Sequence, residues 1–511
     1  MPSPATKSSV DPGLQPEAES MSAKGRVGVI DIGSNTVRLV VYETPTRLPI
    51  PIFNEKAQCA LASGMSKTGK LSPSGVSEAL RSLTRFVKLA EAMDVQRLEA
   101  LGTSAVRDAS DGQAFLGQVE KTCGLQVQVL SGAEEARLAA VGLLNGTPRA
   151  DGVLGDLGGG SLDLVGLDKG ALSSFSTLPL GHIRLGEDSD GDRKKAREIL
   201  QQQLSDIPWL TEMNGRSLYA IGGSWRALAR IFLDQTQRPL HVIDNFTIGF
   251  FDALRLSNLV AGLSPPTLEQ FAEINRRRME TLPYAAAAMA VLLETAQPRE
   301  VVFSAFGVRE GQMIELLPPA LRHQDPLISA CESQAERTGR FGMHGHEILD
   351  WMTPLFPGET DEQKRLRHAT CLINDIGWSE HPDYRAIHSY HRVLRVPYAG
   401  LTHPERAEMA LAVLVRYSGD PESPMVAAYR NLLNDEQFVR AQIIGMALRL
   451  AQTLSGGAPG LLSQTQLTVK NERLVLELLS GSDIYLNEAV ERRFKRLSQK
   501  MGLKSEIVEL S

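Results

Sequence analysis

The sequence is poor in cysteine and has no long apolar run. Its 511 residues include four cysteines, Cys59, Cys123, Cys331 and Cys371, which lie far apart and form no CxxC pair. This spacing excludes a disulfide framework and predicts reduced thiols, as in a cytoplasmic protein. No apolar stretch approaches the roughly 20 residues of a membrane span. Residues 1–23 lack a hydrophobic signal core and are rich in Pro, Ser and Glu, which predicts a disordered tail.

Strand and helix patterns alternate from about Gly25 to about residue 315, which is typical of α/β layers. From Pro318 the pattern is helical as far as Leu454, and the stretch SGGAPG from Ser455 indicates a linker. The remaining residues predict a hairpin around Asn471, a helix and a short strand. We therefore predict four units after the tail, which span residues 24–150, 151–318, 325–454 and 461–511.

A short scheme occurs once in each of the first two units. Residues 31–36 are DIGSNT and residues 156–161 are DLGGGS. In each, an aspartate ends an apolar strand and is followed by a glycine-containing turn, a hydroxyl residue and a second apolar strand. The copies lie about one domain length apart. The simplest explanation is a duplicated domain whose two hairpin loops face each other across a cleft.

Both loops have the composition of an anion site. Glycine permits backbone conformations that a Cβ forbids, so successive N–H groups can converge on one phosphate. Asp31 and Asp156 repel phosphate unless a cation lies between them, and Mg²⁺ binds carboxylates together with phosphate oxygens. The alternative is a pair of ordinary hairpin turns. The candidate phosphate-binding residues are Gly33, Ser34, Asn35, Thr36, Gly158, Gly159, Gly160 and Ser161, and the candidate metal ligands are Asp31 and Asp156.

Neither loop matches a P-loop or a dinucleotide-binding fingerprint, because GxxxxGK[ST] is missing and no GxGxxG joins a strand to a helix there. A third loop, IGGSWR with Gly222 and Gly223, precedes a helix whose first N–H groups suit an anion. The loop at residues 306–311, FGVREG, is similar. A tight strand-to-helix turn explains both nearly as well. Arg107, in another loop, either clamps a phosphate or pairs with Asp108.

The stretch SGAEEAR, residues 131–137, contains a candidate general base. Ser131 and Glu134 have the spacing of a capping box, which occupies Glu134 at the helix start. Glu135 is then free, and the positions three and four residues further on are apolar, so partial desolvation would raise its pKa. The alternative is a plain acidic first turn that the helix dipole favours.

Several stretches occur in one order along residues 27–311: VGVIDIGSNTVRLVVYE, LGTSAVRDA, LSGAEEARLA, LGDLGGGSLDLV, LPLGHIRL, IGGSWRALARI and FGVREG. Together they closely resemble the exopolyphosphatase/guanosine pentaphosphate phosphohydrolase (Ppx/GppA) family, within the actin, Hsp70 and sugar-kinase superfamily. The length and the helical third unit resemble the long, four-domain exopolyphosphatases. The resemblance implies an α/β fold with two actin/Hsp70-like (ribonuclease H-like) lobes around a cleft, then a helical HD-like domain and a small C-terminal α/β domain.

The resemblance also implies hydrolysis of terminal phosphate from inorganic polyphosphate by base-activated water, with Mg²⁺, in many relatives K⁺, and commonly a homodimer. It identifies Glu135 as the base, Arg107 as a further catalytic residue and Asp156 as a magnesium contact. One departure is Asp163, because the family usually has glutamate there and the shorter side chain reaches less far.

The stretch CLINDIGWSEHPDYRAIHSYHRVL resembles an HD-type phosphohydrolase module. A working HD site needs adjacent histidine and aspartate ligands, and here the pair is Asn374-Asp375. Asparagine is a poor replacement for an imidazole ligand. We expect a scaffold that has lost its metal; a residual site using His381, His388 and His391 is the alternative.

We therefore expect an exopolyphosphatase. The alternatives are a guanosine pentaphosphate 5′-phosphatase that binds penta- or tetraphosphate guanosine, a superfamily kinase with polyphosphate as donor, and a non-enzymatic polyphosphate or alarmone sensor. A net charge of −6 and the absence of an aromatic–basic module argue against nucleic-acid binding. A long polyanion needs a local basic track, for which residues 193–197, 276–278 and 492–496 are candidates, although each stretch is more typical of a solvated helix face.

Overall fold

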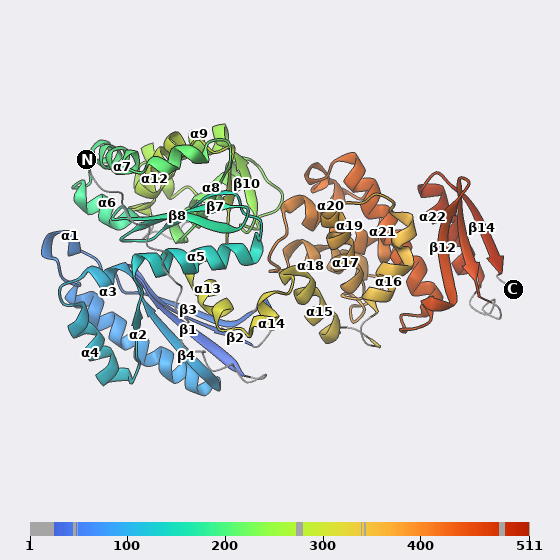
Figure 1. The fold of residues 1–511 in the computed structure, drawn as a ribbon, viewed down its shortest axis with the longest axis horizontal. Helices are drawn as coiled ribbons and strands as arrows, with labels where there is room; N and C mark the ends of the chain where they lie inside the picture. Colours follow the sequence, from blue (N-terminus) through green and yellow to red (C-terminus); the bar gives the residue numbers. More distant parts are fainter. Residues whose placement is uncertain are drawn as a thin grey trace, which may run out of the picture.

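The computed structural model describes residues 25–43, 47–48, 50–271, 279–338, 340–341, 344–479 and 486–509. Two α/β lobes lie side by side at one end of an elongated molecule, and a helical region and a small sheet follow towards the other end (Figure 1). The predicted tail, residues 1–23, and the basic stretch 276–278 lie outside the described residues.

The first lobe contains a 5-stranded sheet of order β3-β2-β1-β4-β5. Its central hairpin, β1 and β2, is antiparallel, and β4 runs parallel to β1 on the other side. Valine and isoleucine side chains of this hairpin are buried, as the strand prediction requires. The elements are β1 (Arg26–Ile32), β2 (Thr36–Tyr42), β3 (Pro51–Gln58), α1 (Met65–Thr68), α2 (Pro73–Ala92), β4 (Val95–Gly102), α3 (Ser104–Asp108), α4 (Gly112–Cys123) and β5 (Gln128–Val129).

The second lobe contains a 6-stranded sheet of order β10-β11-β9-β6-β7-β8. The series β8-β7-β6-β9-β11 has the same order and relative directions as β3-β2-β1-β4-β5, which agrees with a duplicated domain. The elements are α5 (Gly132–Gly146), β6 (Gly152–Leu157), β7 (Leu162–Asp168), β8 (Ala171–Leu178), α6 (His182–Asp188), α7 (Arg193–Ser205), η1 (Pro208–Met213), β9 (Ser217–Ile221), α8 (Gly223–Gln235), β10 (Phe246–Gly249), α9 (Phe250–Gly262), α10 (Pro265–Leu268), α12 (Leu282–Ala296), β11 (Glu300–Phe303) and α13 (Val308–Glu315).

Helices α5 and α13 lie between the two sheets (Figure 1). Small residues of α5 pack on the second sheet, whereas Met313 of α13 packs with residues of the first. The two helices cross with their backbones in contact, because a Cβ on Gly311 would lie 1.9 Å from the Leu138 oxygen and one on Gly142 would lie 2.2 Å from the Gly307 oxygen. Both helices contact both lobes, so these contacts do not assign either helix to one lobe. The predicted boundaries at residues 150 and 318 therefore stay predictions.

The helical region and the C-terminal sheet form one continuous core. The predicted hairpin around Asn471 is present, with Asn471 and Glu472 in the left-handed region that its tight turn requires. The elements are α14 (Pro319–Arg322), α15 (Pro326–Thr338), α16 (Gly345–Met352), η2 (Thr353–Leu355), α17 (Asp361–Leu372), α18 (Arg385–Arg395), α19 (His403–Arg416), α20 (Pro424–Ala427), η3 (Arg430–Leu432), α21 (Asp435–Ser455), η4 (Leu462–Gln464), β12 (Thr465–Lys470), β13 (Arg473–Leu478), α22 (Glu488–Lys500) and β14 (Lys504–Glu509).

The predicted α/β fold class with two related lobes is confirmed by the two sheets. All four cysteines have free thiols. Among the helices that the structure describes, none combines the length and the apolar character that a bilayer crossing needs.

Candidate phosphate-binding site between the lobes

A polar pocket of about 190 Å³ lies where the two predicted hairpin loops meet. Each loop contributes its aspartate and its turn, and the third glycine loop, residues 307–310 and Glu135 also line the pocket. The predicted site residues in the wall are Asp31, Gly33, Ser34, Asn35, Thr36, Glu135, Asp156, Gly158, Gly159, Gly222 and Gly223. Three predicted residues, Arg107, Gly160 and Ser161, lie outside it.

The glycines of the β6–β7 turn allow the two loops to touch. A Cβ on Gly159 would lie 2.9 Å from the Ser34 Cβ, and one on Gly160 would lie 2.8 Å from the Ser104 hydroxyl oxygen. Ser34 and Ser104 are themselves joined by a hydrogen bond of 3.0 Å between their hydroxyl groups. Close approach of the lobes is therefore a second reason for glycine here, beside the anion-binding backbone that we predicted.

Ser161 does not extend into the pocket. Its hydroxyl donates a hydrogen bond of 3.2 Å to Asp163, and its side chain is buried. Among the described hydroxyl residues predicted to bind phosphate, Ser34 and Thr36 line the pocket.

The first turn of α5 separates two adjacent glutamates. The predicted capping box is confirmed, because the Ser131 N–H donates to Glu134 at 2.8 Å and the Glu134 N–H donates to the Ser131 hydroxyl at 3.2 Å. Glu135 lines the pocket with 13% of its side chain exposed. Burial, followed by the nearby Asp163 carboxylate, raises the pKa of Glu135 to about 8.

Arg107 contacts the candidate base. Its Nη1 donates to Glu135 at 3.0 Å and to the Leu130 carbonyl at 3.0 Å. Its Nε donates to Asp108 at 3.2 Å, so the pairing that we considered as an alternative is present. These contacts hold the Glu135 carboxylate in one orientation.

The two loop aspartates differ in their cross-strand neighbours. Asp31 lies opposite Arg38, whereas Asp156 lies opposite Asp163. Arg309 also approaches Asp31 at 3.6 Å. Burial raises the pKa of both loop aspartates, and together with Asp163 it raises that of Asp156 to about 7. Negative charge is thus less well compensated in the second lobe.

This donor set fits a hard divalent cation. Mg²⁺ prefers one or two protein carboxylates and leaves its other positions to water and phosphate oxygens. Asp156 supplies one carboxylate in the pocket and Asp31 supplies a second that already faces Arg309. Within the described ranges, no three or more His, Cys, Asp and Glu side chains are grouped as a full protein cage for a metal.

Four cations that we did not predict as site residues line the same pocket: Arg38, Lys56, Arg226 and Arg309. Burial and the nearby Arg309 lower the pKa of Arg226 to about 10. The signal for Arg38 is the hairpin register, which places it opposite Asp31. Arg226 and Arg309 each stand in the first turn of a helix that follows a glycine loop, and the sequence does not reveal that these two helices converge.

The two predicted basic stretches that the structure describes, residues 193–197 and 492–496, each contain side chains with partners inside the protein. In residues 193–197, Arg197 pairs with Glu294 at 2.5 Å and Lys195 pairs with Asp190 at 3.3 Å. In residues 492–496, Arg492 pairs with Glu488 and Arg493 donates to a threonine of α21.

Two histidines of the HD-like stretch contact nearby carboxylates. His388 bonds to Glu380 at 3.1 Å, and His381 lies 3.7 Å from Asp383. Asn374 accepts a hydrogen bond from Gln452 at 2.6 Å. Each of these side chains is thus engaged with a neighbour inside the helical region.

Comparison with known families gives two matches in chain order. The model described as the Ppx/GppA phosphatase family matches residues 39–320. The model described as the exopolyphosphatase C-terminal region matches residues 327–508. Together they include the helical region and most of the pocket wall, apart from the wall residues between positions 31 and 38.

Individual relatives agree with these matches. Exopolyphosphatase 1 of Mycobacterium tuberculosis is 30% identical over 327 residues, which are 61% of this chain and 90% of that protein. A guanosine-5′-triphosphate,3′-diphosphate pyrophosphatase of Photobacterium profundum is 22% identical over 406 residues, which are 74% of this chain and 77% of that protein. The crystal structure of an exopolyphosphatase from Cytophaga hutchinsonii has a TM-score of 0.52 at 22% identity and covers 57% of this chain and 97% of its own, which shows a shared fold.

Proposed function

The chain belongs to the Ppx/GppA phosphatase family, whose named members are phosphoanhydride hydrolases, and from this premise we propose that it is an exopolyphosphatase that releases terminal phosphate from inorganic polyphosphate. The main support is one observation: a partly buried glutamate with a raised pKa lines the same pocket as two glycine hairpin loops from different lobes. A base beside an anion cradle is the arrangement that hydrolysis of a terminal phosphoryl group requires.

The terminal phosphoryl group binds between the hairpin loops. The turns at Gly33 and Gly158 and the side chains of Arg226 and Arg309 line the small pocket around its oxygens. Mg²⁺ held by Asp156, with Asp31 beside it, would supply further positive charge to those oxygens. Phosphoryl transfer has a loose transition state, so positioning and electrostatics supply most of the rate.

Glu135 accepts a proton from the attacking water at its carboxylate. The Arg107 contact to Oε2 fixes the carboxylate and leaves Oε1 for that water. We therefore assign Arg107 the role of a positioning residue, in place of the phosphate clamp that was the other sequence-based interpretation. Capping keeps the neighbouring Glu134 bonded to the helix start.

The test is phosphate release from long polyphosphate by the Glu135→Gln and Glu134→Gln variants, each with and without Mg²⁺. Loss of a general base typically costs about 10²–10⁴-fold in rate. We expect that loss for Glu135→Gln with polyphosphate binding retained, and a rate near that of the wild type for Glu134→Gln. A Glu135→Gln rate within about threefold of the wild type would remove the assignment of the base.

A second candidate is a guanosine pentaphosphate 5′-phosphatase, because the Photobacterium profundum relative carries that kind of name and matches 74% of this chain. The reaction at the pocket is the same and the leaving group differs. Turnover of polyphosphate and of guanosine pentaphosphate by one preparation, compared as kcat/KM, decides between the two substrates. K⁺ dependence, a homodimer and a cytoplasmic location stay predictions for the same preparation.

A further inference from the structure

A second polar pocket lies in the helical region, outside the lobes. Its volume is about 350 Å³, within the range of small-molecule sites. Its wall is formed by the ends of α19 and α21, the start of α18 and one residue of α22. Its five arginines are Arg340, Arg385, Arg416, Arg449 and Arg493, and none of the described residues in its wall is acidic.

An indole ring holds two of these arginines. The guanidinium carbon of Arg340 lies 3.6 Å from the ring centroid of Trp378, and that of Arg385 lies 4.1 Å from it. Cation–π contacts of this kind fix a guanidinium group without neutralising its charge. Some of their N–H groups are used within the protein, because Arg340 also donates to Gln452 at 2.9 Å and Arg385 donates to the Glu380 carbonyl at 3.0 Å. The other N–H groups of these two arginines are left to meet a ligand.

Asp375 neutralises part of the remaining charge. Arg340 pairs with it at 3.2 Å and Arg416 pairs with it at 2.9 Å. This aspartate belongs to the Asn374-Asp375 pair that stands where an HD-type enzyme has metal ligands. Here it binds guanidinium groups, so arginine supplies the positive charge in this part of the fold.

Among the five arginines of this pocket, Arg449 has the positive charge that is least neutralised by neighbouring groups. In the described part of the chain its guanidinium group has neither a hydrogen-bond acceptor nor a carboxylate partner, and the Nε of Arg416 is buried without an acceptor. Burial and the like charges of Arg493 and its neighbours lower the pKa of Arg449 to about 10. Such crowding is unfavourable unless an anion enters the pocket.

Helix ends explain only part of the cluster. α19 ends at Arg416 and α21 ends at Ser455, and the C-terminal end of a helix attracts cations within its last turn. Arg449 lies more than one turn before the end of α21 and donates to no carbonyl group among the described residues. It therefore needs another explanation.

We propose that this pocket is a non-catalytic binding site for an oligophosphate anion, that is, several linked phosphate groups. Arginine recognises phosphate oxygens through paired N–H donors. Five arginines against one aspartate exceed the charge of about −2 that a single phosphate group carries. The identity of the anion rests on the proposed function, whereas the presence of an anion site does not.

The experiment measures binding in the full chain with the hydrolysis-deficient Glu135→Gln background. Tripolyphosphate and inorganic phosphate are titrated calorimetrically into this protein, with Arg449→Gln or with Arg473→Gln added. Arg473 pairs with Glu506 on the C-terminal sheet and is a control of equal charge. We expect two classes of tripolyphosphate site, of which Arg449→Gln weakens one at least tenfold and Arg473→Gln neither. Equal binding by the two variants, or inorganic phosphate binding as tightly as tripolyphosphate, would overturn the proposal.

Two further measurements distinguish a loss of binding from a loss of folding, and show whether the bound anion is the substrate or a separate molecule. Because Arg449→Gln relieves like-charge repulsion, its melting temperature without ligand should equal or exceed that of the wild type. A lower melting temperature together with lost binding would overturn the proposal. Arg493→Gln repeats the test.

With Glu135 intact, Arg449→Gln should raise KM for long polyphosphate and leave tripolyphosphate hydrolysis unchanged if the pocket holds the substrate tail. Unchanged kinetics on both substrates, with binding still lost, would assign the pocket to a separate oligophosphate effector. Binding is measured whether or not the protein hydrolyses polyphosphate, so failure of the two proposals is distinguishable.

Discussion

At the scale of single residues, the adjacent glutamates Glu134 and Glu135 have pKa values that shift in opposite directions. The Ser131 N–H holds the pKa of Glu134 below its usual value, while burial raises the pKa of Glu135 to about 8. The difference arises from the capping geometry, which assigns one carboxylate to the backbone and directs the next into the pocket. Glu135 is the carboxylate of this turn that lines the pocket, while Glu134 is bonded to the helix start.

The pH dependence of activity should reveal Arg107 as a positioning residue. Its cation opposes the rise in the pKa of Glu135, so in Arg107→Gln the rise of activity from acid pH, where the base loses its proton, should move to higher pH by about one unit or more. The measurement is the rising limb of kcat/KM against pH for polyphosphate. Arg97→Gln, which breaks an ion pair with Glu99 on β4, is the control and should leave the limb in place.

The stability of the ligand-free protein should fall with rising pH because of Glu135. Its folded pKa of about 8 exceeds the ordinary 4.5, so between these values the folded state holds a proton that the unfolded state has released. We therefore compare the free energy of unfolding of Glu135→Gln with that of the wild type at about pH 5 and about pH 8.5. The difference should change in favour of the variant at the higher pH by an amount on the order of 1–4 kcal/mol. Urea unfolding at both pH values measures it. Glu134→Gln should show no such gain, since the shift of Glu134 has the opposite direction.

At the scale of elements, the crossing of α5 and α13 fixes the site. Glu135 stands in the first turn of α5 and Arg309 in that of α13, so the contact between these helices sets the position of base and cation relative to both loops. Gly142 and Gly311 make the contact possible. Packing of helices is normally limited by side chains to axis distances of about 8–10 Å.

Alanine at Gly311 should therefore destabilise the lobes. Its Cβ would lie 1.9 Å from the Leu138 carbonyl oxygen, a backbone atom that cannot move aside alone. We expect a loss of about 2–4 kcal/mol in free energy of unfolding together with reduced phosphate release. Gly117→Ala is the matched control, because nothing lies within 4 Å of the added carbon in helix α4, and it should stabilise by about 0.5–1 kcal/mol.

Local patterns predicted the hairpins and the capping box, and long-range packing accounts for what they did not predict. The turn at Gly33 and the cap at Ser131 depend on residues within a few positions, so the sequence contains their whole explanation. The convergence of Arg226 and Arg309 depends on the order of strands β9 and β11 and on the path of α13. The bond from Arg107 to Glu135 likewise joins separate elements, and no spacing rule predicts it.

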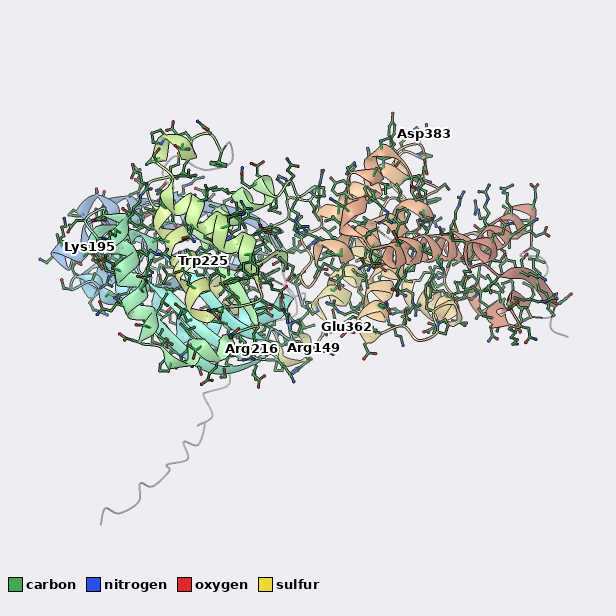
Figure 2. The ribbon with its side chains drawn as sticks, turned by 90° about the horizontal axis from the view of Figure 1, so that it is seen from above. Arg149, Lys195, Arg216, Trp225, Glu362 and Asp383 are labelled. Carbon is green, nitrogen blue, oxygen red and sulfur yellow. The ribbon has the colours of Figure 1, made fainter. Side chains whose placement is uncertain are left out.

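At the scale of the whole molecule, the lobes and the helical region share a built junction. His403 at the start of α19 donates to the Val242 carbonyl of the second lobe at 2.7 Å, and its ring stacks with Phe246 at 5.9 Å between centroids. Arg149 and Glu362 pair across the same boundary at 3.0 Å (Figure 2). Because an exposed pair contributes little, the buried histidine is the stronger of these two polar contacts.

This junction should weaken in acid. Burial lowers the pKa of His403 to about 4 from 6.5, so the unfolded state binds a proton first and the contribution of His403 to stability is lost as pH falls from about 6.5 to about 4. His403→Phe should reduce the loss of melting temperature between about pH 7 and about pH 5. His381→Phe, at an exposed site, is the control. An equal loss in both variants would contradict the role of His403.

The backbone contact between α5 and α13 has a mechanical consequence. Because Gly142 and Gly311 bring the two helix backbones into direct contact, we expect this contact to act as a pivot when the lobes move relative to each other. Glu135 and Arg309 lie on these two helices, whereas the hairpin loops belong to the sheets of the two lobes. We therefore expect a small rotation of one lobe to separate the loops from the phosphate while Glu135 and Arg309 stay almost in place. The end of a polymer would then be released and bound again while Glu135 and Arg309 keep their relative positions.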